Sequence, residues 1–132
     1  MLTIKQDQMD VFQQHMEQNF VRSLAQELRQ GHPDEVAALD DEELYRRITI
    51  GIQRAARYGL EDEYSLEIFT TLMFVAAPNF DHHALFKEIL NTPDLPPEQR
   101  LEYAMEISTD EDWQEIEDNR DDRVWQTTPE SI

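Results

Sequence analysis

The stretch PNFDHHALF, residues 78–86, places Asp81, His82 and His83 in a row, and both residue types serve as metal ligands and acid–base groups. A metal ion needs donors that converge on it from neighbouring turns. Adjacent residues on a helix point about 100 degrees apart, so only one histidine could face a site together with Asp81. We therefore expect Asp81 to cap the helix that follows, with the histidines on its solvent side. We expect no metal and no cofactor there.

The rest of the chain offers little for catalysis. The pair Asp40-Asp41 lacks the apolar surroundings that would raise a carboxyl pKa for acid–base work. The three glycines form no phosphate-binding loop, no Gly-x-Ser-x-Gly sequence is present, and there is no cysteine to act as a nucleophile. We expect a protein without enzymatic activity.

A group of arginines is the first candidate for binding a partner. Between residues 46 and 57, four of the eleven basic residues fall within about 100 degrees of one another on a helical wheel, with Ile50 among them. One interpretation is that guanidinium groups surround an exposed isoleucine and bind a protein. The other is that they pair with the chain's own surplus acids. We call this set the arginine strip: Arg46, Arg47, Ile50, Arg54 and Arg57.

Two tryptophans complete the candidate partner-binding residues. We expect Trp113 to fold back with Ile116 onto the helical body. Trp125, beside Val124 and flanked by charges, is typical of an anchor in a short recognition segment, because one tryptophan can supply much of an interface's binding energy. The alternative is a disordered segment without that role.

The charge of the chain limits its partners. Its 132 residues carry a formal charge of −18, which repels nucleic-acid phosphates and anionic lipids, so we expect neither nucleic acid nor membrane as a partner. The N-terminus has no apolar run that could form a signal peptide, and no stretch approaches the roughly 20 apolar residues that span a bilayer. A cytoplasmic location and a protein partner are expected.

Helical spacing of apolar residues predicts an all-α fold, a single compact bundle of five to seven helices. The segment IFTTLMFV could instead form a buried strand, but no second strand is predicted to pair with it. Apolar residues on most sides of the helix that contains it predict a place at the centre of the bundle. The main helices are expected over residues 5–29, 41–58, 61–77, 82–90 and 97–108.

The C-terminal residues differ in composition from the rest. From residue 110 to the end the net charge is −7. Such a composition is typical of disordered or loosely helical segments. We therefore predict a helical domain at residues 1–108 and an acidic, partly disordered tail at residues 109–132. With Trp125, this tail is expected to provide a second contact if the partner is basic.

Two stretches carry a family resemblance, GIQRAARYGL at residues 51–60 and LMFVAAPNFD at residues 72–81. They resemble segments of small helical proteins that are encoded beside type VI secretion spike and effector genes. The resemblance extends from residue 1 to about residue 90. The chain departs from the family pattern at residues 77–79, and its long acidic C-terminus is also particular to it.

The resemblance implies a genetic context and no specific site. It implies a partner that is a secreted effector or toxin, or a spike component. The protein would then be an adaptor or chaperone that helps to load the effector, or alternatively an immunity protein that neutralises a toxin. An acidic nucleic-acid mimic is a third possibility, which we rank last because the arginine strip would interrupt a phosphate-like surface.

Overall fold

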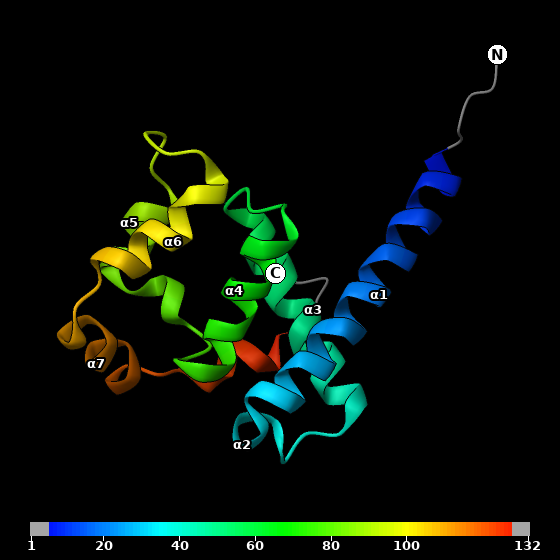
Figure 1. The fold of residues 1–132 in the computed structure, drawn as a ribbon, viewed down its shortest axis with the longest axis horizontal. Coiled ribbons are helices and arrows are strands. Elements are labelled where there is room, and N and C mark those ends of the chain that lie inside the picture. Colours follow the sequence, from blue (N-terminus) through cyan, green and yellow to red (C-terminus); the bar gives the residue numbers. More distant parts are fainter. Residues whose placement is uncertain (1–5, 128–132) are drawn as a thin grey trace.

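The computed structural model describes the backbone of residues 6–127 and the side chains of residues 17–127. The described residues form seven α-helices and two short 3-10 helices and contain no strand, which confirms the all-α prediction and excludes the strand alternative. In order, the elements are α1 (Gln6–Gly31), α2 (Pro33–Val36), α3 (Asp41–Arg57), α4 (Glu63–Val75), η1 (Phe80–His82), α5 (Ala84–Leu90), α6 (Pro97–Ile107), α7 (Asp110–Asp118) and η2 (Asp122–Gln126) (Figure 1).

Local residues set the ends of the helices. The Asp40 carboxylate accepts a hydrogen bond of 2.8 Å from the backbone N–H of Glu43 and so caps α3. Gly59 follows α3 with a φ of 82°, a conformation that favours glycine and ends the helix. Asp62 caps α4 in the same manner, through the N–H of Ser65 at 3.0 Å. Pro97 begins α6, where a missing N–H has no cost.

The helix α1 is longer than the others, and its N-terminal half extends beyond the rest of the bundle (Figure 1). Its C-terminal half packs on α3, where Leu24 and Leu28 are buried. The apolar stripe of α1 continues in the sequence through Phe12 and Met16, whose side chains lie outside the described residues. None of the described helices is both long enough and apolar enough to cross a bilayer.

The helices α3 and α4 pack closely because α3 carries a glycine at the contact. A Cβ atom added to Gly51 would lie 2.8 Å from Oγ1 of Thr70 and 2.9 Å from its Cγ2. The Thr70 side chain is fully buried, so it has little room to move away. This contact sets the spacing between the two helices that form the middle of the fold.

We expect Gly51→Ala to lower the free energy of unfolding by about 1–3 kcal/mol, because the added methyl group overpacks the α3–α4 contact. The measurement is urea denaturation followed by circular dichroism. Gly31→Ala is the matched control, since a Cβ there meets nothing within 4 Å. Equal stability of the two variants would contradict the close approach at Gly51.

A row of aromatic rings joins the second half of the chain. Ring centroids lie 4.8 Å apart between Phe69 and Phe80, 5.4 Å between Phe80 and Phe86, and 5.3 Å between Phe86 and Trp113. The row runs from α4 through η1 and α5 to α7. Trp113 therefore folds back onto the body as predicted, together with the buried Ile116.

The prediction of a separate, partly disordered tail is wrong for the described part of residues 109–132. Thr109 begins α7 with a capping box, in which its hydroxyl accepts from the N–H of Asp112 and its own N–H donates to the Asp112 carboxylate. Ile116, Val124 and Trp125 belong to the same buried core as the other helices. The acids lie mostly on the solvent side, so the composition did not reveal the few apolar residues that dock. Residues 128–132 lie outside the described residues.

Candidate functional site

A buried ion pair joins α3 to η1. Nη2 of Arg54 donates to both carboxylate oxygens of Asp81, at 2.7 and 2.9 Å, and the Tyr58 hydroxyl donates to Oδ2 at 2.7 Å. The side chains of Arg54 and Asp81 are only 11% and 2% exposed. Residues 51–60 and 72–81, the two stretches that carry the family resemblance, thus meet at this cluster.

This geometry corrects the prediction that Asp81 caps a helix. The residue lies within η1, whose turn directs its carboxylate inward, and α5 begins after His83 instead. His83 provides the cap, because its Nδ1 accepts from the N–H of Leu85 at 3.2 Å. Of the two histidines, His82 is exposed as expected, whereas His83 is largely buried.

The charges of Arg54 and Asp81 in this cluster neutralise each other. Burial, followed by the hydrogen bond to Asp81, raises the pKa of Tyr58, so its hydroxyl stays protonated as a donor. A hollow of about 210 Å³ is lined by this cluster with Arg57 and His82, but the Asp81 carboxylate already neutralises Arg54 within it. The cluster therefore holds η1 against α3, and we assign it a structural role.

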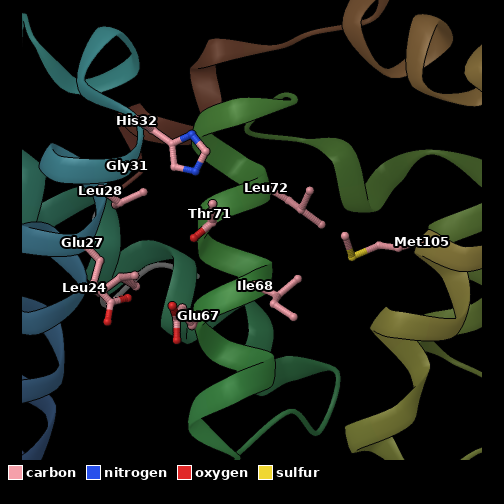
Figure 2. A pocket seen from close by; sticks show the side chains of 10 residues that line it. All are labelled: Leu24, Glu27, Leu28, Gly31, His32, Glu67, Ile68, Thr71, Leu72 and Met105. Carbon is pink, nitrogen blue, oxygen red and sulfur yellow. The ribbon is translucent and has the colours of Figure 1, made fainter.

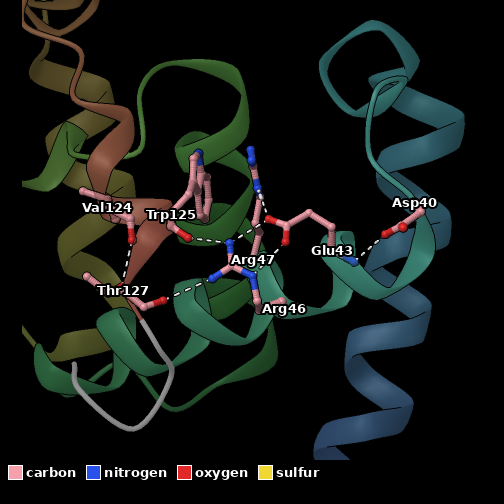
Figure 3. A network of polar contacts seen from close by, with 7 residues as sticks. All are labelled: Asp40, Glu43, Arg46, Arg47, Val124, Trp125 and Thr127. Atoms are coloured by element: carbon pink, nitrogen blue, oxygen red, sulfur yellow. Dashed lines mark hydrogen bonds and ion pairs between the residues drawn. The ribbon is translucent and has the colours of Figure 1, made fainter.

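The other end of the arginine strip holds the C-terminal segment. Arg46 donates through Nε and Nη2 to the Glu43 carboxylate, at 2.8 and 2.7 Å, and also to the carbonyl oxygens of Trp125 and Thr127 (Figure 3). Nε of Arg47 donates to Glu43 at 2.8 Å, and its guanidinium lies 5.3 Å from the ring centroid of Trp125. Arg46 and Arg47, both paired with Glu43, thus hold η2 on α3.

The structure overturns two expectations about this strip. Ile50 was expected to be exposed but is 0% exposed and belongs to the buried core. The arginines one turn before and after it, Arg46 and Arg54, bind η2 and η1 respectively. Trp125 is neither a free anchor nor part of a disordered segment. It is 3% exposed and packs against Phe74 with ring centroids 4.9 Å apart.

Most arginines of the strip form ion pairs within the chain. Arg46, Arg47 and Arg54 pair with the protein's own acids, which confirms that interpretation for these three. Arg57 remains exposed. A partner that binds the strip as predicted would have to displace η2 first.

The ion pairs of Glu43 predict a pH effect on stability. Its pKa is lowered to about 2, mainly by the hydrogen bond from Arg46 and also by that from Arg47, against an opposing effect of burial. A carboxyl group whose folded pKa is depressed stabilises the fold above its ordinary pKa of 4.5 and loses that contribution as the pH falls toward 2.

We therefore expect Glu43→Gln to cost about 1–2 kcal/mol at neutral pH, a figure reduced for the partial exposure of the group. The variant should lose less further stability than the parent between pH 4.5 and 2. Urea denaturation at stepped pH measures both effects. Glu42→Gln, at an exposed neighbouring position, should follow the parent, and identical pH curves for the two variants would contradict the prediction.

A second cluster brings His83 close to Asp112 and Glu115. Ligand atoms of the three residues lie within 4.8 Å of one another, an arrangement that the sequence did not predict. However, Nδ1 of His83 accepts a backbone N–H, so Nε2 carries the proton of the neutral ring and donates to Glu115 at 2.7 Å. A metal bound to Nε2 would require the ring proton to sit on Nδ1. That proton would point at the N–H of Leu85, and the hydrogen bond between them would be lost. We assign the cluster to the docking of α7.

The helix α4 lies in the middle of the fold, but a shallow groove leaves one of its sides open. Its opposite side packs on α3 and is buried through Phe69 and Met73. On the open side, Tyr64 and Val75 at the two ends are 57% and 40% exposed. We call the hollow between them the α4 groove. It has a volume of about 320 Å³ and is formed mainly by Leu24, Glu27, Leu28, Glu67, Ile68, Thr71, Leu72 and Met105.

Figure 2 shows the arrangement of this groove. The helix α4 forms its floor with Ile68 and Leu72, the helix α1 forms one wall, and Met105 of α6 lies on the opposite side. Most of the lining is apolar. The sequence contained a signal for this face, since Tyr64, Ile68 and Val75 recur at helical spacing on one side, but apolar residues around the rest of the helix obscured it.

Two carboxylates face each other in the α4 groove, Glu27 from α1 and Glu67 from α4 (Figure 2). A hydrogen bond with Glu27 is the largest cause of a raised pKa at Glu67, followed by burial and by the charges of Glu27 and Glu63. No salt bridge connects either carboxylate to a basic residue of the described part of the chain. The groove therefore combines apolar walls with two acidic side chains that no lysine or arginine of the described residues pairs with, and His32 also contributes to its lining.

Comparison of the chain with known protein families, with curated proteins and with solved structures finds no match. The geometry of the described residues is therefore the basis for assigning a function. The type VI secretion context remains a prediction.

Proposed function

We propose that the protein is a non-catalytic accessory protein that binds a protein partner through the α4 groove and serves as an adaptor or chaperone for a secreted effector. The observation that carries this proposal is the open apolar side of α4, with Tyr64 and Val75 exposed at its ends. Exposed apolar residues that are continuous with a hollow are a mark of interaction sites, because a partner that covers them removes apolar surface from water.

The family resemblance supplies the class of partner. Proteins encoded beside type VI spike and effector genes have an effector, a toxin or a spike component as their natural partner. An effector that waits in the cytoplasm before secretion has apolar segments that would otherwise aggregate. A groove that covers one such segment without reaching an active site suits an adaptor or chaperone.

An immunity protein is the alternative, and the net charge of −18 favours it, since an acidic surface would accelerate encounter with a cationic toxin. The acidic nucleic-acid mimic stays third. These roles differ in what they do to the partner, because an immunity protein and a mimic act by blocking a site.

The test is co-expression with the product of the neighbouring effector gene. We expect the two proteins to co-purify and the effector to gain soluble yield, while cells that express both remain sensitive to the effector. Protection of the cells would instead identify an immunity protein. Absence of a complex, together with an unchanged soluble yield, would contradict the proposed function.

A further inference from the structure

We infer that the α4 groove receives an amphipathic helix of the partner, whose lysine or arginine inserts between Glu27 and Glu67. This inference rests on the proposed function and specifies the chemistry of the partner.

The shape of the groove suits a helix. Its floor runs along α4 from Glu67 to Leu72, about 8 Å or one and a half helical turns, and the exposed Tyr64 and Val75 extend the apolar side of α4 by about one turn at each end. A helix laid on such a floor places apolar residues at positions i, i+3, i+4 and i+7 against Ile68 and Leu72. Met105 on the far side can adapt to different side chains, because methionine is flexible and polarizable.

The charge of the groove selects a basic side chain. Glu27 and Glu67 come from opposite elements and line the same groove, and no salt bridge pairs either of them with a basic residue of the described part of the chain. A lysine or arginine between them would favour the ionised form of both and donate charge-assisted hydrogen bonds to both carboxylates. An acidic or uncharged helix would leave the two acids unpaired and partly desolvated, so the groove discriminates against it.

The same charge argues against a second copy of this chain as the occupant. The amphipathic segment that a copy could offer most readily is the N-terminal half of α1, which extends from the bundle (Figure 1). Residues 6–20 contain Asp7, Asp10 and Glu17 and have no lysine or arginine. This segment would bring further negative charge to Glu27 and Glu67.

The probe is a fluorescein-labelled peptide of about 18 residues, long enough to form a helix, with a leucine stripe and one central lysine. A second peptide carries glutamine in place of that lysine. Fluorescence anisotropy should show the lysine peptide binding the parent protein about tenfold more tightly than the glutamine peptide. This preference should fall to near one in the double variant Glu27→Gln with Glu67→Gln.

The matched control is Glu88→Gln with Glu117→Gln, which removes the same charge at two exposed positions outside the groove. It should keep the preference for lysine. Ile68→Asp tests the apolar contact and should weaken both peptides about tenfold or more, with an unchanged helical circular dichroism spectrum. The inference is wrong if the parent binds neither peptide, if the control variant loses the preference as the groove variant does, or if the parent is a dimer that Ile68→Asp dissociates.

The same variants separate this inference from the proposed function. If the effector co-purifies equally with the parent and with Ile68→Asp, the accessory role stands and the groove is not its site. If the peptides behave as expected but the effector does not bind the parent, the groove chemistry stands and the assigned role is wrong.

Discussion

Asp81→Asn is expected to lower the free energy of unfolding by about 3–5 kcal/mol, because it leaves the guanidinium of Arg54 buried without its counter-charge. The substitution preserves the size of the side chain, so the loss reports the charge and its hydrogen bonds. The Tyr58 hydroxyl would also lose a charged acceptor at 2.7 Å. Urea denaturation followed by circular dichroism measures the effect.

Two further variants make this expectation specific. Asp122→Asn removes an acid whose pairing with Arg120 is exposed, and it should change the stability by less than about 1 kcal/mol. Arg54→Met combined with Asp81→Asn removes both buried charges, so its cost should be smaller than the sum of the two single costs. If Asp81→Asn proves as harmless as Asp122→Asn, the buried pair does not hold η1 on α3.

Trp125→Ala is expected to cost about 3–5 kcal/mol, since it removes a buried ring that packs on Phe74 and lies under the guanidinium of Arg47. It should also release η2 from Arg46 and Arg47 of α3. Hydrogen exchange should then show faster exchange of the backbone amides of η2 than in the parent.

The control for this variant is Gln126→Ala, which changes an exposed residue of the same segment. It should remain within about 0.5 kcal/mol of the parent. A cost for Trp125→Ala no larger than that of its neighbour would mean that η2 contributes little to the fold. In that case the sequence-based prediction of a free C-terminal segment would be restored.

These expectations also bear on where a partner can bind. The arginine strip looked like the binding surface because scarce positive charge is gathered there, but Arg46, Arg47 and Arg54 serve contacts within the chain. The α4 groove has the opposite character, with apolar walls and two carboxylates. Binding of a partner there would leave both ion-pair clusters intact.

Local chemistry along the sequence determined most of the helix boundaries. The cap at Asp40, the stop at Gly59 and the start at Pro97 each depend on one residue and its nearest backbone groups. Such interactions involve residues within a single turn, so they can be identified without knowledge of the rest of the fold. The fold class followed from helical spacing for the same reason.

Only the tertiary structure decided which helix faces are covered. A helical wheel shows that Ile50 lies among arginines, but not that η2, some 75 residues later, lies over that face. Asp81 has the residue type of a cap, yet its partner is Arg54 on another helix. Trp125 lies in a segment whose average composition is acidic, but burial of its single ring is enough to dock that segment on the body. The open side of α4 depends in the same way on where α1 and α6 lie. Burial arises between elements that are distant in sequence, so it cannot be identified from one segment alone.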